Sequence, residues 1–375
     1  MSTNFSRRHI MQLASAAALA SSSASPQQQP SQTKIRGPRA EGPNTPKVCQ
    51  QIGPLRHSAG TFDEAGMRRI KQLGVDYVLT SEIRGPWEEA ALRSAVDRLK
   101  AGGLTLAHMY LPGLRDAVYG KPGRDAEIEA AIRNIRVAGK VGIPVLEYNW
   151  YGHRASEGYY GETARGGSGI TSFDYDRVKD LPPLPQEGVH TAEELWSTIT
   201  YFLKAVIPEA EKAGVRLSIH PNDPPAPISR GSGQIMASVD GWKRLIKIVD
   251  SPSNGITFDC GVTWETGNDP VEVCRYFGTR DRINHVHFRN VIVRKPSERY
   301  SEVFIDAGEV NMFAVMKELV KHKYTRLIHP EHPRALDYDT QQPGFQAQYP
   351  GGGGYAGWAF NVAYTRALLQ AALDS

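Results

Sequence analysis

The chain has 375 residues, 40% hydrophobic and 22% charged, and a net charge of +4 from 44 basic and 40 acidic side chains. This length suffices for one large domain with a sizeable core. The small, dispersed positive excess argues against nucleic acid or an acidic membrane as partner, and the three scattered cysteines argue against a disulfide framework.

Residues 1–26 are predicted to be an export signal. The segment Ser6-Arg7-Arg8-His9-Ile10-Met11 resembles the twin-arginine motif, and an Ala-rich apolar stretch and small residues near Ala24-Ser25-Pro26 follow it. The apolar part is too short to span a membrane as a mature helix. We therefore expect a cleaved signal peptide, a periplasmic location and a disordered linker over 27–46, which is rich in Gln, Pro and Ser. The alternative is a disordered tail with a chance Arg pair.

From Val48 onward, short β-rich runs alternate with amphipathic helical stretches. The predicted strands are Val48–Ile52, Asp76–Thr80, Leu104–Tyr110, Pro144–Tyr148, Arg216–His220, Gly255–Asp259, Ile283–Phe288 and Arg326–Glu331. The predicted helices lie near 63–73, 87–101, 125–140, 191–213, 239–249, 269–277, 311–322 and 357–373. Eight of each is the count of an α/β fold of the (β/α)8 TIM-barrel type, so we predict a single barrel domain over 47–375. If this count of strands and helices is off by one, the fold would be a doubly wound open sheet. No Gly-rich phosphate loop follows the first strand, which argues against that fold.

Two long connections follow strands and therefore lie at the end of the barrel that carries chemistry. Residues 149–190 are rich in Trp, Tyr, His and Arg, and residues 333–356 are rich in Gly, Gln and Tyr. Loops of this length usually serve as lids or substrate-binding segments, and we predict that role here. The alternative is that these two connections are surface loops without a function.

Four acid or imidazole side chains end four successive predicted strands: His220, Asp259, His287 and Glu331. The carboxyl ends of parallel barrel strands meet at one rim, so these groups are predicted to hold a divalent metal there. Each residue alone is weak evidence, since a single strand-end histidine is more often structural. A carboxylate at a hydrophobic strand end is costly without a partner, and a cation supplies one.

Asp259 and Cys260 are alternative ligands, because successive side chains of a strand face opposite sides. A carboxylate favours Mn²⁺, Mg²⁺ or a similar hard ion, whereas a thiolate favours zinc or iron. Because the other predicted ligands are two imidazoles and a carboxylate, we favour Asp259 and keep Cys260 as the alternative.

The segment Asn284-His285-Val286-His287-Phe288-Arg289 places His285 and His287 on one face by its period of two. His285 lies one layer deeper and is either a core histidine or a partner of the metal ligands. Arg289 continues on the same face and suits an anionic substrate group, because a guanidinium pairs well with a carboxylate. His332, next to Glu331, is a candidate acid or base.

Several motifs resemble those of the mannonate dehydratases. They are His220-Pro-Asn-Asp-Pro-Pro, Asn254-Gly-Ile-Thr-Phe, His285-Val-His-Phe-Arg-Asn-Val, Asp306-Ala-Gly-Glu-Val-Asn-Met-Phe-Ala-Val-Met-Lys and Glu331-His-x-Arg. The likeness runs from about residue 48 to the carboxyl terminus and is strongest from 211 to 334. The resemblance implies a metal-dependent barrel of the xylose-isomerase-like group that converts D-mannonate to 2-keto-3-deoxy-D-gluconate with Mn²⁺ or Fe²⁺.

The resemblance also implies roles for individual residues. His220 and His287 match metal histidines, Glu331 matches a metal aspartate, and His332 matches an acid–base histidine followed by Arg334. Three positions depart from the family pattern: Asp259 stands where the family has a metal cysteine, Glu replaces Asp at 331, and only Tyr355 lies near the position of a family tyrosine.

These observations together give a predicted site and a predicted function. The predicted catalytic residues are His332 and Tyr355, and the predicted substrate-binding residues are Arg289, Asn290, Arg334 and Asp223. We expect dehydration of a small-molecule sugar acid, with a metal-dependent sugar isomerase or epimerase and a non-catalytic sugar-acid binding protein as alternatives. We expect no nucleic acid partner and no stable insertion into a membrane after signal cleavage. The sequence allows a homo-oligomer.

Overall fold

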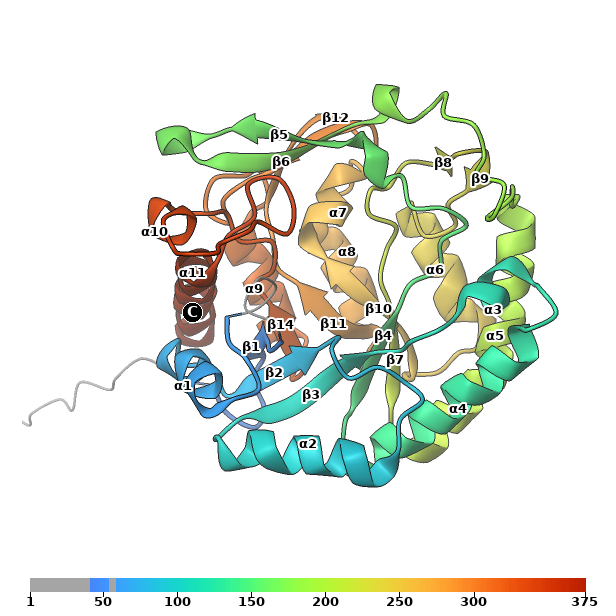
Figure 1. Cartoon of the computed structure of the whole chain (residues 1–375), viewed down its shortest axis with the longest axis horizontal. Helices are drawn as coiled ribbons and strands as arrows, with labels where there is room; N and C mark the ends of the chain where they lie inside the picture. Colours follow the sequence, from blue (N-terminus) through green and yellow to red (C-terminus); the bar gives the residue numbers. More distant parts are fainter. Residues whose placement is uncertain (1–40, 54–58) are drawn as a thin grey trace, which may run out of the picture. The chain divides into compact units, whose positions relative to one another are not determined.

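The computed structural model describes residues 41–53 and 59–375, and its centre is a closed barrel of eight strands (Figure 1). In barrel order the strands are β1 (Lys47–Gln51), β14 (Leu327–His329), β11 (Ile283–His287), β10 (Asn254–Asp259), β7 (Arg216–Ile219), β4 (Val145–Tyr148), β3 (Thr105–Tyr110) and β2 (Tyr77–Thr80). Every neighbouring pair is parallel. The predicted (β/α)8 barrel is confirmed.

The chain divides into two units, Met1–Gly37 and Pro38–Ser375, and the described residues belong to the second. The predicted signal peptide and most of the predicted linker lie outside the described residues. Strand β1 begins at Lys47, where the barrel domain is predicted to start.

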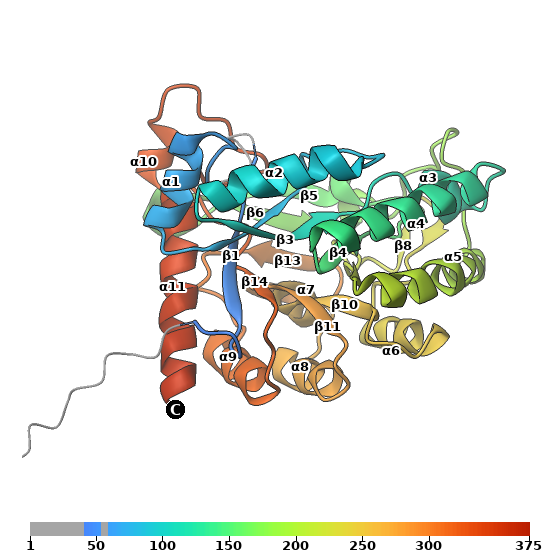
Figure 2. The same ribbon diagram turned by 90° about the horizontal axis from the view of Figure 1, so that it is seen from below.

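Helices surround the barrel, and Figure 2 shows several of them edge-on. They are α1 (Glu64–Gln72), α2 (Glu89–Ala101), α3 (Arg115–Tyr119), α4 (Arg124–Val141), α5 (Ala192–Ala213), α6 (Val239–Ile248), α7 (Cys260–Glu265), α8 (Pro270–Gly278), α9 (Met312–Lys321), α10 (Asp337–Thr340) and α11 (Tyr355–Asp374). Local signals fix their ends. Thr191 and Glu194 form a capping box at the start of α5, and Gly214 ends that helix with φ +67°, a conformation that glycine adopts without strain.

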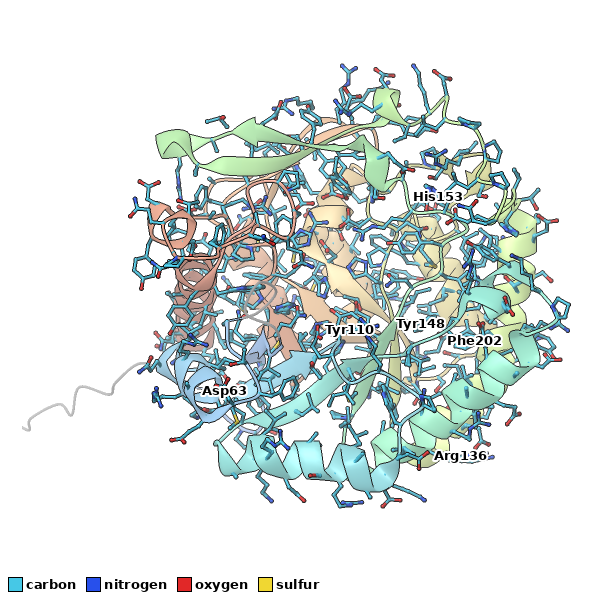
Figure 3. All side chains as sticks on the ribbon, viewed as in Figure 1. Asp63, Tyr110, Arg136, Tyr148, His153 and Phe202 are labelled. Atoms are coloured by element: carbon cyan, nitrogen blue, oxygen red, sulfur yellow. The ribbon has the colours of Figure 1, made fainter. Side chains whose placement is uncertain are left out.

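The main hydrophobic core lies between the strands and the surrounding helices. In β11, Val286 belongs to this core, whereas His285 and His287 point into the barrel. Tyr148 of β4 packs against Phe202 of α5, with ring centroids 5.5 Å apart (Figure 3). The period of two thus separates an apolar outer face from an unusually polar barrel interior.

A second sheet, which we call the cap sheet, adds to the barrel and was not predicted. Its order is β12 (Val291–Lys295), β13 (Arg299–Glu302), β6 (Gly169–Asp174) and β5 (Tyr159–Thr163), all antiparallel. Strands β5 and β6 come from the long connection after β4, and β12 and β13 follow β11. A short hairpin of β8 (Ile228–Ser229) and β9 (Ser232–Gly233) completes the strands that the structure describes. Among the described residues, no helix combines the length and apolar character needed to cross a membrane.

Candidate metal centre

The four predicted metal ligands lie at the carboxyl ends of four adjacent barrel strands. Asp259 and His287 are the last residues of β10 and β11, His220 directly follows β7, and Glu331 lies just beyond β14. We call these four residues the strand-end cluster. Parallel neighbours deliver their carboxyl ends to the same rim of a barrel, which is why residues spread over more than one hundred positions of sequence meet.

The side-chain atoms of the strand-end cluster face a common space. Nε2 of His220 lies 3.0 Å from Nδ1 of His287, and Oδ2 of Asp259 lies 3.8 Å and 3.7 Å from these two nitrogens. Oε1 of Glu331 lies 3.8 Å from Nδ1 of His287. Two imidazole nitrogens and two carboxylate oxygens form a donor set that suits a divalent transition-metal ion.

Neighbouring backbone groups orient two of these side chains. Nδ1 of His220 donates a hydrogen bond to the carbonyl of Pro221 at 2.7 Å, so the lone pair of Nε2 is free to face the cluster. Oδ1 of Asp259 accepts from the backbone N–H of Val262 at 2.8 Å at the start of α7, which leaves Oδ2 for the cluster. Metal-binding histidines and carboxylates in proteins are commonly oriented by such bonds.

The electrostatics of the cluster favour a bound positive charge. Burial lowers the pKa of His287, but Glu331, Glu147 and Asp259 outweigh burial and raise that pKa to about 9. Burial raises the pKa of Asp259, but Arg289 and His287 hold it well below its usual range. Asp259 is therefore ionised at neutral pH, and its charge attracts either a proton on His287 or a metal cation.

Two buried polar atoms of the cluster have no hydrogen-bond partner within residues 41–53 and 59–375. They are Nε2 of His287 and Oε1 of Glu331. Nε of Arg289 lies 3.0 Å from that carboxylate oxygen, close enough for an ion pair but without the geometry of a hydrogen bond. Because buried polar atoms are normally satisfied, the unpartnered Oε1 of Glu331 fits a cation at the strand-end cluster.

Carboxylates surround the guanidinium of Arg289. Its Nη1 donates to Glu265 at 2.7 Å, its Nε donates to Asp259 at 3.1 Å, and its Nη2 lies 3.4 Å from Asp223. The missing side chain of Gly261 makes room, because a Cβ there would lie 2.7 Å from Nη1. Arg289 is predicted to bind substrate from its position in the sequence, but in the structure it balances buried carboxylates instead.

Arg334 is buried as well, and the protein itself occupies its guanidinium. Nη1 donates to the hydroxyl of Thr171 at 2.8 Å, Nη2 donates to Glu302 at 3.1 Å, and Nε donates to the carbonyl of His332 at 3.1 Å. Arg334 therefore joins the loop after β14 to the cap sheet, and its contact with substrate stays a prediction.

Asn290 contacts backbone groups rather than a binding site. Its Nδ2 donates to the carbonyls of Ile305 and Val310 at 3.0 and 3.3 Å, and its Oδ1 accepts from the N–H groups of Val291 and Val310 at 3.0 Å each. These bonds use both donors and both lone pairs of the amide. In the structure Asn290 thus holds the chain after β11 in shape, and its role in substrate binding stays a prediction.

Asp223 positions two groups that line the site. Its Oδ1 accepts hydrogen bonds from the hydroxyls of Tyr159 at 2.5 Å and Tyr300 at 3.2 Å. Its backbone carbonyl accepts from Nε of Arg154 at 2.6 Å. Asp223 is 2% exposed, so in the structure it orients Tyr159 and Arg154 instead of binding substrate as predicted.

His332 lies between two carboxylates beside the strand-end cluster. Its Nδ1 donates to Glu302 at 2.5 Å, and its Nε2 lies 3.0 Å from Oε2 of Glu331. Burial lowers the pKa of His332, but the two carboxylates outweigh burial and raise it. Its φ of +49° is uncommon for a residue with a side chain and indicates a position held by its surroundings. Glu302 was not identified in the sequence analysis, because the pairing of its strand, β13, with β6 joins segments far apart in the sequence.

Tyr355 does not reach the strand-end cluster. It is the first residue of α11, and its hydroxyl donates to the carbonyl of Arg69 in α1 at 3.0 Å. Tyr349 lies beside His332 instead, with ring centroids 4.9 Å apart. The structure therefore places Tyr349, not Tyr355, beside His332 and in the lining of the cavity, and the catalytic role of Tyr355 stays a prediction.

Cys260 is buried within the hydrophobic core at the first position of α7. Burial raises the pKa of its thiol well above the usual range, with a further contribution from Asp259. No potential metal-binding group of the described residues includes Cys260. Asp259, not Cys260, faces the strand-end cluster.

A cavity of about 370 Å³ opens above Glu331 and His332. Its lining comes from the barrel rim, the cap sheet and both long connections: Gln51, Tyr110, Arg154, Ser156, Tyr159, Thr171, Glu302, His329, Glu331, His332, Gln348, Tyr349, Pro350 and Trp358. Arg154 is the one arginine among these lining residues, and its side chain is half exposed. The cavity is large enough for a small polar ligand.

Known proteins share this fold and much of this sequence. "Mannonate dehydratase" of Streptococcus equi subsp. zooepidemicus is 31% identical over 318 residues, which cover 76% of this chain and 87% of that protein. The chain belongs to the mannonate dehydratase family. The family model "D-mannonate dehydratase (UxuA)" matches residues 186–372, the part that contains the whole strand-end cluster.

Solved structures agree with this family membership. The crystal structure of mannonate dehydratase from Streptococcus suis serotype 2 matches with a TM-score of 0.76 and 28% identity, covering 88% of this chain and 95% of that one. An L-ribulose 3-epimerase matches with a TM-score of 0.54 and 14% identity over 88% of this chain and 96% of that one, which shows the fold alone. The resemblance to mannonate dehydratases drawn from the motifs is confirmed.

Proposed function

We propose that this protein dehydrates D-mannonate to 2-keto-3-deoxy-D-gluconate and water. The observation that carries the proposal is the strand-end cluster, whose Glu331 lines the cavity together with His332, in a chain of the mannonate dehydratase family. The two imidazoles and two carboxylates favour Mn²⁺ or Fe²⁺ as the divalent metal.

The reaction transfers the C2 proton, beside the substrate carboxylate, to a base and expels the C3 hydroxyl as water with a proton from an acid. The enol that results tautomerises to the 2-keto acid. The C2 proton is barely acidic, and a bound divalent ion supplies Lewis acidity that stabilises the negative charge that develops there. The protein has to orient the sugar acid, exclude water and provide proton transfer.

His332 is assigned to donate a proton to the departing C3 hydroxyl. Its pKa is raised by Glu302 and Glu331 in spite of burial, so the ring stays protonated to a higher pH than a free histidine. Glu302 holds Nδ1, which leaves Nε2 as the ring nitrogen that exchanges a proton. A positioned acid of this kind typically contributes about 10²–10⁴-fold to the rate.

Arg154 is assigned to bind the substrate carboxylate. Its side chain is 50% exposed and lines the cavity, whereas the guanidinium groups of Arg289 and Arg334 are occupied by the protein. The carbonyl of Asp223 fixes Nε, so the outer edge of the guanidinium remains for an anion.

Product analysis tests the proposed reaction. Purified protein loaded with Mn²⁺ is incubated with D-mannonate, and the products are identified by NMR and by mass. The proposal expects a 2-keto-3-deoxy acid that is one water lighter than the substrate. A ketose or an epimer of unchanged mass would instead indicate a sugar isomerase or epimerase. The carboxylates at 259 and 331 are also consistent with that class of enzyme. Tight binding without turnover would indicate a binding protein.

We further propose that the twin-arginine motif at Arg7 and Arg8 exports the protein to the periplasm. The support is the motif and the Ala-rich stretch after it. Cell fractionation of the native host, with Arg7→Lys/Arg8→Lys as the matched variant, tests this. We expect the wild-type protein in the periplasm and the variant in the cytoplasm. An equal distribution of the two proteins would contradict export by this motif.

A further inference from the structure

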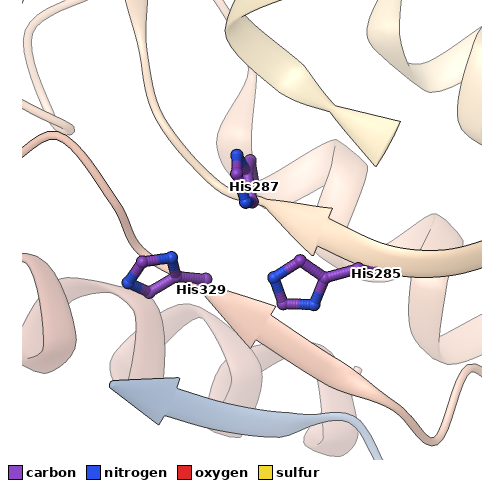
Figure 4. A group of neighbouring side chains, drawn as sticks. All are labelled: His285, His287 and His329. Atoms are coloured by element: carbon purple, nitrogen blue, oxygen red, sulfur yellow. The ribbon is translucent and has the colours of Figure 1, made fainter. Parts of the chain in front are cut away.

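A second group of imidazoles lies one layer below the strand-end cluster, deeper in the barrel (Figure 4). His285 precedes His287 by two residues in β11, and His329 precedes Glu331 by two residues at the end of β14. The period of two points each of these side chains into the barrel. We call His285, His287 and His329 the imidazole layer.

The three rings surround one point. Ring centroids of His285 and His287 lie 5.1 Å apart, those of His287 and His329 5.7 Å, and those of His285 and His329 6.4 Å. One ring nitrogen from each residue lies within 4.8 Å of the other two. The rings come from adjacent strands, so the backbone of the barrel fixes this arrangement.

Most ring nitrogens of the imidazole layer lack a hydrogen-bond partner in the described part of the chain. Both ring nitrogens of His285, both of His329 and Nε2 of His287 are buried without a hydrogen-bond partner there. The three side chains are at most 4% exposed. Buried polar atoms are normally satisfied, so five such nitrogens together indicate a ligand rather than empty packing.

We propose that the imidazole layer is a second metal site, held by His285, His329 and Nε2 of His287. Three nitrogen donors without a carboxylate favour Zn²⁺, Cu²⁺ or Ni²⁺ over Mn²⁺ or Mg²⁺, and Zn²⁺ is the ion we assign. Nδ1 of His287 faces the strand-end cluster, which leaves Nε2 as the ring nitrogen for the imidazole layer. A ring that binds both ions is an imidazolate, so filling both sites displaces its last ring proton.

Neighbouring groups complete this second site. Oε2 of Glu147 lies 3.7 Å from Nε2 of His287 and 3.1 Å from Nε2 of His108, which places a carboxylate next to the bound charge. The ring of His329 stacks on Trp358 with centroids 5.5 Å apart, and this contact fixes its orientation. His329 also lines the cavity, which gives an ion a route from solvent.

Metal counting with Zn²⁺ alone as the probe tests the second site. Apoprotein is saturated with Zn²⁺, dialysed, and analysed for bound metal per chain. We expect two ions in wild type and one ion in each of His285→Ala, His329→Ala and His220→Ala. His322→Ala, at the end of α9 and outside both clusters, serves as the matched control and keeps two. One ion in wild type, or two ions in both imidazole-layer variants, would overturn the second site.

Crystals of wild-type protein soaked in Zn²⁺ avoid any dependence on how the variants fold. Anomalous difference maps at the zinc edge should show one peak among His285, His287 and His329, separate from a peak at the strand-end cluster. Water or an empty space at that position, without anomalous signal, would contradict the second site. Neither measurement depends on turnover of D-mannonate, so the proposed dehydration and the second site can fail independently.

Discussion

Nδ1 of His332 donates a hydrogen bond of 2.5 Å to Oε2 of Glu302, and this contact joins the barrel rim to the cap sheet. The two residues come from the loop after β14 and from β13. The bond fixes which ring nitrogen of His332 faces the cavity. It also makes the cap sheet part of the site, because the partner of the proposed acid comes from an element outside the barrel.

Glu302→Gln should lower kcat for D-mannonate by about tenfold or more, because a hydrogen bond to a charged group contributes about 1.5–3 kcal/mol. The loss of the carboxylate should also lower the pKa of His332 and shift the upper limb of the kcat–pH profile to lower pH. Steady-state kinetics over a range of pH measure both effects. Glu298→Gln, at the exposed turn before β13, is the control. An unchanged pH profile in the Glu302 variant would show that Glu302 has only a structural role.

Arg154→Gln should raise KM for D-mannonate by about tenfold or more, since the variant loses a charge-assisted bond to the substrate carboxylate. The metal content should stay that of wild type. Steady-state kinetics measure KM, and Arg280→Gln at the end of α8 is a matched surface control. A wild-type KM in the Arg154 variant would remove Arg154 from the binding site.

Asn290→Ala should lower the free energy of unfolding by at least about 2 kcal/mol, because buried backbone groups that lose a partner cost about 1–3 kcal/mol each. KM of the folded fraction should stay near that of wild type. Urea denaturation and steady-state kinetics measure these quantities, with the less buried Asn268→Ala for comparison. A stable variant with a greatly raised KM would restore Asn290 to substrate binding.

Affinity for Mn²⁺ should fall as the pH is lowered. The carboxylates around His287 outweigh its burial and raise its pKa to about 9, so below that pH the metal-free protein carries a proton that the ion must displace. The dissociation constant should therefore rise by up to about tenfold per pH unit between about pH 8.5 and 6.5. Calorimetry in buffers of different ionisation enthalpy measures the affinity and the proton release. A pH-independent affinity with no proton released would contradict this account.

The barrel and the strand-end cluster could be predicted because both depend on local patterns. Alternating strands and helices indicate the barrel, and a ligand at the end of a strand needs only the strand to be recognised. His287 and Asp259 are of this kind. In a parallel barrel the meeting point of such residues follows from the fold.

The roles of the arginines and of Asn290 could not be predicted in the same way. A guanidinium or an amide pairs with whatever the tertiary structure brings to it. Arg289 meets carboxylates from several segments, and Asn290 meets the backbone of Ile305 and Val310. The cap sheet was missed because its two hairpins are joined only by the pairing of β13 with β6, which spans more than one hundred residues of sequence, so Glu302 was missed with it.

Titration with Mn²⁺, followed by electron paramagnetic resonance, tests the strand-end cluster most directly in wild type, Asp259→Asn and Cys260→Ser. The structure directs Asp259 into the cluster and buries Cys260 in the core. We expect Asp259→Asn to abolish high-affinity binding and Cys260→Ser to leave it unchanged. Loss of binding in the Cys260 variant, with binding intact in the Asp259 variant, would contradict the account.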